Sequence, residues 1–175
     1  MAQREALKEL QTRLAARLQA ARTEGTAVAS WLAVEAAGQR LLFPLAQSGE
    51  IFSWSGVQPV PYTQPWFLGV ANLRGALTGV VDLAALLGQG RPRSEQALAE
   101  TSLLALNAAL QVNAALLIDQ LVGLRAADAF VASEPAGADA APYLGAVHVD
   151  AEGGRWQELD LQVLAEHPEF LSIGT

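Results

Sequence analysis

The spacing of glycine and proline residues is the feature that most limits how this chain can fold. From Ala27 onward, short apolar runs are interrupted by these residues about every eight to twelve positions, without the three- and four-residue periodicity of a helix. Short apolar runs separated by turn formers are typical of β-sandwiches and β-barrels. The sequence therefore predicts a mainly β domain.

Seven runs in this region have the composition expected of strands. They are residues 28–36, 40–44, 69–74, 77–83, 102–106, 113–118 and 146–149. Two short helices are also expected, over residues 82–87 and 159–165. The run ALNAALQVNAALLID within residues 105–124 has helix propensity, but its Asn and Gln residues favour a hairpin turn between two strands. Residues 88–96 and 133–142 are predicted to be surface loops.

The N-terminal segment has a different pattern and is predicted to form an amphipathic helix. Its apolar stripe is formed by Leu7, Leu10, Leu14 and Leu18. We treat residues 1–26 as a helical extension and residues 27–175 as one domain. Residues 1–24 carry a net charge of +2 and the remainder a net charge of -9. Two interpretations stay open: the stripe packs on its own domain, or the helix docks on a partner or an acidic surface.

Composition excludes several classes of protein. The net charge of -7 disfavours nucleic acid as a partner, because a phosphate backbone repels an acidic surface. The absence of cysteine removes disulfides, thiolate nucleophiles and cysteine-bound zinc. No stretch reaches the roughly 18 uninterrupted apolar residues needed to span a bilayer, and no apolar secretion signal is present. We therefore expect a cytoplasmic protein without direct membrane insertion.

No pattern of catalytic or metal-binding residues stands out. The only lysine is Lys8, and no glycine-rich phosphate loop occurs. The two histidines, His148 and His167, lack acidic neighbours at ligand spacing and are expected on the surface or in loops. Asp82 and Asp119 each end an apolar run and are expected to cap the following helix or turn. We therefore predict no enzyme activity, no cofactor and no metal; the alternative is a hydrolase with an unrecognised site around Asp82 or His148.

Residues 59–88, PVPYTQPWFLGVANLRGALTGVVDLAALLG, contain the most specific motifs of the chain. The Asn-Leu-Arg-Gly tetrad at 72–75, followed by Val-Asp-Leu at 81–83, resembles the CheW-like family of chemotaxis coupling domains. Weaker similarities on both sides extend the resemblance over residues 31–164. It implies a fold of two five-stranded SH3-like β-barrels packed around a shared apolar core.

The resemblance also implies a function. Domains of this family are non-catalytic adaptors that join the cytoplasmic tip of a methyl-accepting chemoreceptor to a CheA-like histidine kinase, whose regulatory domain shares the fold. The protein is then expected to be associated with membrane receptor arrays through these partners.

By the same resemblance, Gly69, Asn72 and Arg74 are expected near the receptor or kinase contact, with Glu50 and Ile51 on an adjoining strand. In an extended segment Asn72 and Arg74 share one face, while the intervening leucine points inward. An arginine suits such a contact because its planar guanidinium group can donate two parallel hydrogen bonds to one carboxylate. The alternative is that Arg74 pairs with a carboxylate of its own domain.

Residues 56–65 and 156–171 resemble the PilI-type coupling proteins, which belong to the chemosensory system of type IV pili and twitching motility. This resemblance implies a role in that pathway. Two alternatives stay open, a flagellar-type chemotaxis coupling protein and an oligomerisation scaffold driven by the N-terminal helix.

Overall fold

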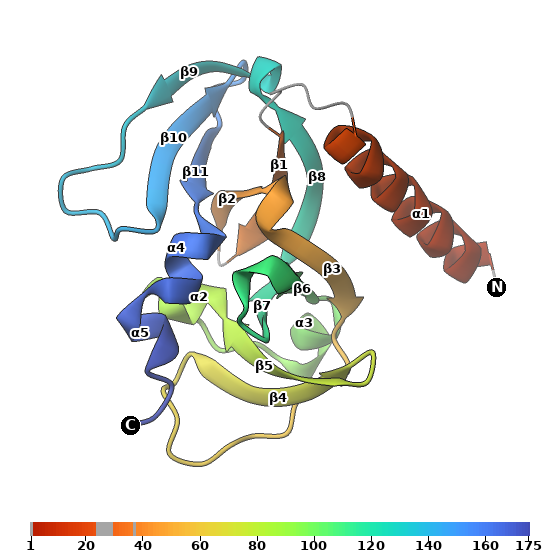
Figure 1. Ribbon diagram of the computed structural model, residues 1–175, viewed down its shortest axis with the longest axis vertical. Helices are drawn as coiled ribbons and strands as arrows, with labels where there is room; N and C mark the ends of the chain where they lie inside the picture. The colour runs from red at the N-terminus through yellow and green to blue at the C-terminus, as the bar shows by residue number, and fades with distance from the viewer. Residues whose placement is uncertain (1, 24–29, 37) are drawn as a thin grey trace.

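Two curved β-sheets form the body of the molecule, and one long helix extends from it (Figure 1). The computed structural model describes residues 2–23, 30–36 and 38–175. The mainly β fold predicted from the sequence is confirmed.

The first sheet has six strands in the order β8-β1-β2-β11-β10-β9. Its strands are β1 (Ser30–Ala36), β2 (Gln39–Pro44), β8 (Gln120–Ala126), β9 (Phe130–Glu134), β10 (Leu144–Asp150) and β11 (Arg155–Leu159). Only the β2 and β11 pair is parallel among the described strands of this sheet.

The second sheet has five strands in the order β3-β6-β7-β5-β4. Its strands are β3 (Ser48–Ser53), β4 (Phe67–Leu73), β5 (Ala76–Asp82), β6 (Ser102–Leu106) and β7 (Ala114–Ile118). The β5 and β7 pair is parallel, so the carboxyl ends of these two strands meet at one edge. Residues 107–113 turn between β6 and β7 through a single 3-10 turn, η2 (Ala108–Leu110), as the hairpin interpretation predicts.

Three apolar clusters organise the two sheets. The largest contains Leu32 and Phe43 of the first sheet together with Leu104 and Leu116 of the second, so it is a core shared between the sheets. Each sheet also curves around a smaller cluster of its own. This arrangement agrees with the expected pair of barrels, with two differences. The first sheet has six strands rather than five, and the hydrogen-bonded order of each sheet, over the described residues, ends in two edge strands.

Short helices fill the connections between the strands. They are α2 (Leu83–Leu86), α3 (Glu95–Ala99), α4 (Leu161–Glu166) and α5 (Pro168–Leu171), with further 3-10 turns η1 (Leu45–Gln47) and η3 (Ala127–Ala129). The two predicted short helices correspond to α2 and α4, whose N-caps are Asp82 and Asp160. Both aspartates accept hydrogen bonds from backbone N–H groups of the first helical turn, which satisfies donors that have no partner within the helix.

Several elements differ from the sequence-based expectation. Strands β8, β9 and β11 and helices α3 and α5 were not among the expected elements, and β3 was expected only through the resemblance, as the strand of Glu50 and Ile51. Most of these strands are half-exposed and mix polar with apolar residues, so they lack a strong apolar run. The predicted loop at 133–142 begins inside β9. The first two residues of the expected strand at 28–36 lie outside the described residues.

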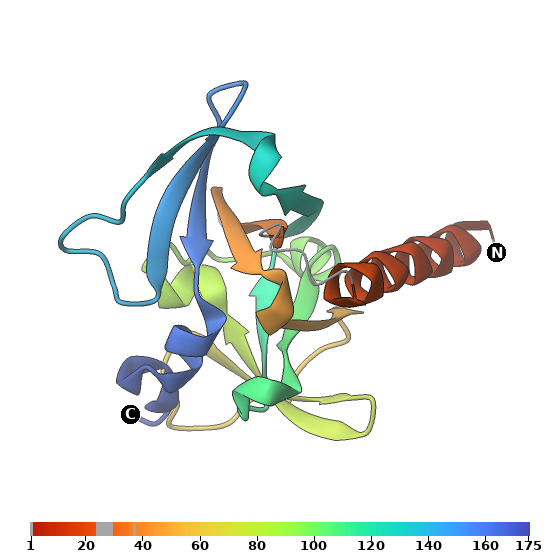
Figure 2. The ribbon, with the colours of Figure 1, turned by 45° about the horizontal axis from the view of Figure 1, so that its top comes forward.

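Helix α1 (Ala2–Thr23) confirms the predicted N-terminal helix. It projects from the body on the side of β8 and β3 (Figure 2). Leu7 and Leu10 are exposed, so these two leucines do not pack on the body of the molecule. None of the described helices is both long and apolar enough to cross a membrane.

Candidate protein-binding site

A shallow depression lies between β3 and the hairpin formed by β4 and β5. It has a volume of about 360 Å³ and brings together Glu50, Ile51, Asn72 and Arg74. Figure 1 shows the tip of the hairpin beside the end of β3. Because β3 and β4 are the edge strands of the second sheet, their curvature places residues far apart in sequence side by side. Four of the five residues predicted for partner binding therefore line one surface feature.

The tip of the hairpin fixes how Arg74 is presented. Arg74 and Gly75 have φ angles of 51° and 80°, both in the left-handed region that tight hairpin turns require. The Asn72 side-chain oxygen accepts a hydrogen bond of 2.8 Å from the backbone N–H of Gly75. Strand β4 ends at Leu73, so the expectation that Asn72 and Arg74 share one strand face is wrong. Leu73 does point inward, as predicted.

Arg74 forms an ion pair within its own domain. Its Nη2 atom lies 2.6 Å from Glu50 Oε1, while the two side chains remain 75% and 42% exposed. An ion pair in contact with water contributes only about 0.2–1 kcal/mol to stability. The alternative interpretation, in which Arg74 pairs with a carboxylate of its own domain, therefore holds for the chain without a partner. The guanidinium still faces solvent and can exchange Glu50 for a carboxylate of a partner.

Gly69 lies outside this depression and has a structural role. It is buried and adopts a φ of +143°, and a Cβ atom there would lie 2.2 Å from the backbone oxygen of Gln58. The backbone N–H groups of Gln58 and Val70 each donate to the carbonyl oxygen of the other residue, at 2.8 and 2.9 Å. Gly69 therefore lets the segment before β4 pair with that strand, and its contact with a partner stays a prediction.

The structure adds residues that the sequence reasoning missed. Further residues line the depression: Phe52, Ser53, Ser55 and Leu73 of the second sheet and the segment after β3, and Gln11 of α1. Leu77 pairs with Asn72 across the hairpin and is 66% exposed. Leu77 therefore adds exposed apolar surface beside the hairpin tip that carries Arg74. In the sequence, Leu77 was only the first residue of the expected strand at 77–83. A role in binding is indicated by its position beside the hairpin tip, which only the structure shows.

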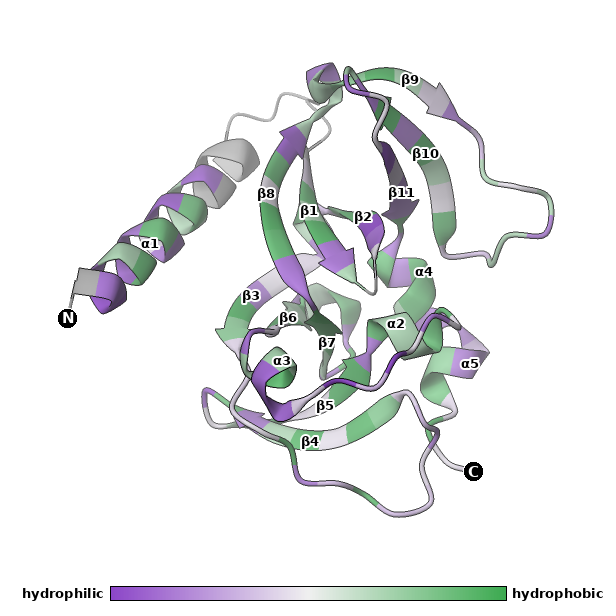
Figure 3. Ribbon diagram, turned by 180° about the vertical axis from the view of Figure 1, so that it is seen from behind, coloured by the Kyte–Doolittle hydropathy of each residue, from purple (hydrophilic) through white to green (hydrophobic). Residues whose placement is uncertain are grey.

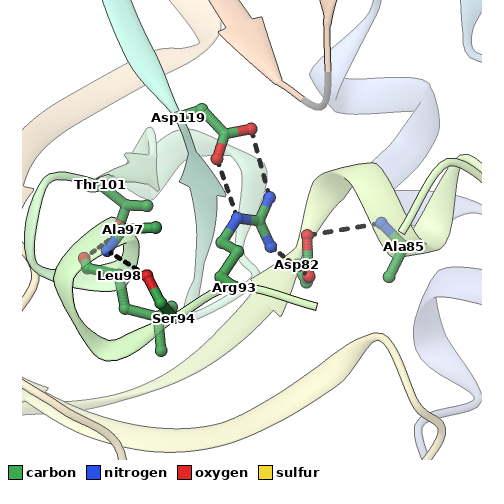
Figure 4. A network of polar contacts seen from close by, with 8 residues as sticks. All are labelled: Asp82, Ala85, Arg93, Ser94, Ala97, Leu98, Thr101 and Asp119. Atoms are coloured by element: carbon green, nitrogen blue, oxygen red, sulfur yellow. Dashed lines mark hydrogen bonds and ion pairs between the residues drawn. The ribbon is translucent and has the colours of Figure 1, made fainter. Parts of the chain in front are cut away.

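A second charged cluster lies at the carboxyl ends of β5 and β7 (Figure 4). The Arg93 guanidinium donates to Asp119 at 2.8 and 3.2 Å and to Asp82 at 2.7 Å. The hydrogen bond to Asp119 contributes most to raising the Arg93 pKa further above its ordinary value; burial opposes this rise, and Asp82 adds to it. Asp82 also caps α2, as predicted, by accepting from the Ala85 N–H at 3.4 Å. Both carboxylate oxygens of Asp119 accept from Arg93, and the expected capping role of Asp119 stays a prediction.

The two histidines occupy different environments. His148 lies on β10 with Nε2 3.0 Å from Glu158 Oε2, and its ring contacts Trp31 and Phe130 at centroid distances of 4.9 and 5.3 Å. Its side chain is only 14% exposed, so the expected surface position of His148 is wrong. His167, between α4 and α5, accepts from the Glu169 N–H. No group of three or more potential metal ligands is found over the described parts of the chain.

Comparisons with known proteins agree on one family. Residues 30–169 match the CheW-like domain. Protein PilI of Pseudomonas aeruginosa is 28% identical over 167 residues, which cover 92% of this chain and 88% of that protein. The crystal structure of scaffolding protein TtCheW from Thermoanaerobacter tengcongensis superposes with a TM-score of 0.64 at 16% identity, covering 81% of this chain and 94% of that one. The structural similarity supports the fold, and the matched domain covers most of the chain.

Proposed function

Because the chain belongs to the CheW-like domain family, we propose that it is a non-catalytic adaptor that couples a chemoreceptor to a CheA-like histidine kinase. The observation that carries this proposal is the depression between β3 and the β4–β5 hairpin. All of its described lining residues except Gln11 belong to the matched domain, and it presents an exposed arginine, an acidic residue and apolar side chains together. Such a combination recognises another protein surface through a few anchoring contacts.

Arg74 is the proposed anchor of this surface, with Glu50, Ile51 and Asn72 around it. On binding, a partner carboxylate replaces or joins Glu50 at the guanidinium. The replaced contact is exposed and weak, so the exchange costs little. Gly69 supports the site indirectly, by allowing the close approach of Gln58 to β4, the strand that carries Asn72.

A non-catalytic role is supported by the pairing of the candidate catalytic side chains with other side chains of the fold. Asp82 and Asp119 are both bound to Arg93, and His148 is paired with Glu158 among aromatic rings. The hydrolase alternative was placed around Asp82 or His148. Each of them has a structural partner, and none lines the depression.

The pathway is proposed from the similarity to PilI. We assign the protein to a cytoplasmic chemosensory system that controls type IV pili and twitching motility, where it is held at receptor arrays by its partners. In the source organism, loss of the chain should then abolish twitching. Loss of flagellar chemotaxis with normal twitching would support the flagellar-type alternative instead.

The adaptor role is tested by reversing the charge of Arg74. We expect Arg74→Glu to weaken binding to the regulatory domain of the cognate CheA-like kinase or to the receptor tip by about thirtyfold or more, because a central charged contact becomes repulsive. Co-purification followed by calorimetric titration measures this loss, and circular dichroism checks that the fold is intact.

The first sheet offers a matched control. Arg155 forms a comparable exposed ion pair with Glu134, with the two side chains 59% and 53% exposed. Arg155→Glu makes the same charge change away from the depression and should leave binding unchanged. Equal effects of the two substitutions would contradict the proposed site.

A further inference from the structure

We infer that the leucine stripe of α1 is a docking surface for an acidic helical partner, a protein helix whose own apolar stripe is bordered by carboxylates. This inference goes beyond the proposed adaptor function, because α1 lies outside the matched residues 30–169.

The stripe is exposed in the structure. Leu7 and Leu10 are 51% and 60% exposed, and Leu14 is half-buried. Among the residues whose burial is described, none of α1 belongs to the apolar clusters of the body. Seen from behind, the helix lies outside both sheets (Figure 3), and Gln11 is its one described residue that lines the depression beside β3. Most of the stability of a helix in a protein comes from packing of its apolar face, so a partner that covers the stripe would also stabilise α1.

Cations border the stripe on both sides. With about 100° between successive residues of a helix, Arg13 and Arg17 flank the stripe beside Leu10, and Arg4 flanks it beside Leu7. No ion pair with a described carboxylate is found for these three arginines. Their charges are therefore available to a partner that contacts the leucines.

The acidic residues of α1 lie elsewhere. Glu5 and Glu9 fall on the opposite face of the helix by the same geometry. The segment is thus basic along its apolar stripe and acidic behind it. Charges that flank an apolar seam select the partner of a paired helix, and this pattern selects carboxylates.

Two other occupants fit the stripe less well. A second copy of α1 would place Arg4, Arg13 and Arg17 near cations of the same kind, which disfavours self-pairing. An anionic lipid surface would complement the flanking arginines, but helices that lie in a membrane interface carry Lys and Arg over their polar face and Trp, Phe or Leu on the other, whereas the polar face of α1 carries Glu5 and Glu9. Residues 2–23 contain no Trp, Phe or Tyr, and the narrow three- and four-residue spacing of the leucines is that of a helix–helix seam.

The inference is tested with the full chain and a synthetic probe. The probe is a fluorescent peptide as long as α1, with leucine at the a and d positions and glutamate at the e and g positions of each heptad. We expect it to bind, to raise the helical circular dichroism signal, and to lose affinity as salt is added. A peptide with lysine in place of glutamate should bind about tenfold more weakly or not at all.

Paired variants locate the contact on α1. Arg13→Glu combined with Arg17→Glu should reduce acidic-peptide affinity by about tenfold. Thr12→Glu combined with Ala16→Glu adds negative charge to the opposite face of α1 and should reduce the affinity for the acidic peptide much less. The inference is overturned if both peptides bind alike, if neither binds, if phosphatidylserine vesicles bind in preference, or if the chain self-associates through α1.

Kinase binding is measured on the same variants. The one described residue of α1 that lines the depression with Arg74 is Gln11, and none of the substituted α1 residues lines it. The α1 variants should therefore bind the kinase domain as the unchanged chain does. A failure of the peptide experiment therefore leaves the adaptor proposal intact. In the same way, a failure of the Arg74 experiment leaves the inference about α1 intact.

Discussion

Arg93 joins the carboxyl ends of the parallel strands β5 and β7 through Asp82 and Asp119. The Arg93 and Asp82 side chains are only 11% and 10% exposed. Charged groups at such positions depend on their partners, because each has lost most of its contact with water. The cluster therefore acts as a clamp between the segment that carries Arg93 and the second sheet.

Removal of this clamp should destabilise the fold. We expect Arg93→Ala to lower the free energy of unfolding by about 3 kcal/mol, since it leaves two carboxylates without their cation. Arg91→Ala, on an exposed residue of the same segment, should change it by less than about 0.5 kcal/mol. Urea denaturation followed by tryptophan fluorescence compares the two; equal stabilities would refute the clamp.

Asp150 gives the fold a dependence on acidic pH. Its carboxylate accepts hydrogen bonds from Trp156 Nε1 at 3.0 Å and from the Gly154 N–H at 2.7 Å. The Trp156 hydrogen bond is the largest cause that lowers the Asp150 pKa, and the Gly154 backbone adds to it. A lowered pKa in the folded state stabilises the protein above the ordinary pKa of about 4, and this contribution is lost as the pH falls through the folded value.

The corresponding prediction uses Asp150→Asn. At pH 7 this variant should be less stable than the unchanged chain, because it lacks the charged acceptor. The difference should shrink as the pH is lowered below about 4, where the carboxylate becomes protonated. Thermal unfolding at a series of pH values measures it, and a difference that stays constant or grows toward low pH would exclude this role.

Single residues also show what the sequence could and could not predict. The capping role of Asp82 is encoded locally, by an aspartate directly before a short apolar helix. The pairing of Asp119 with Arg93 spans 26 positions, and no local pattern encodes it. Glu50 and Arg74 were named through the family resemblance, but the ion pair between them follows only from the curvature of the second sheet.

At the scale of elements, prediction succeeded where the apolar runs are buried. Strands β6 and β7, which are nearly all buried, were predicted to within one residue at each end. Strand β8 is half-exposed along most of its length and was missed. A strand that forms one side of a curved sheet has no strong period-two pattern when neither of its faces is fully covered.

The pairing of β4 with the segment before it depends on Gly69. We expect Gly69→Ala to cost about 2 kcal/mol or more, because the methyl group would collide with the Gln58 carbonyl in a backbone conformation that alanine rarely adopts. Gly137→Ala is the control, since a Cβ there meets nothing within 4 Å. Chemical denaturation reports the difference, and a stable Gly69→Ala protein would show that the close approach is dispensable.

The whole molecule combines one core shared between the two sheets with a depression beside β3 and an exposed leucine stripe on α1. The core explains why residues from both halves of the sequence are needed for one domain, since β1 and β2 precede the second sheet in the chain and β8 to β11 follow it. The mainly β class followed from the residue pattern alone. The two-layer arrangement around a shared core followed from the family resemblance, because periodicity does not specify which strands pair.

The central claim is that Arg74 acts on a partner rather than on its own domain. The variant Glu50→Arg combined with Arg74→Glu restores the internal ion pair with its polarity reversed. We predict that this double variant folds normally and still fails to bind the CheA-like kinase domain and the receptor tip, because the charge presented to the partner is inverted. Recovery of full binding by the double variant would contradict the claim, since it would show that Arg74 serves only to hold Glu50.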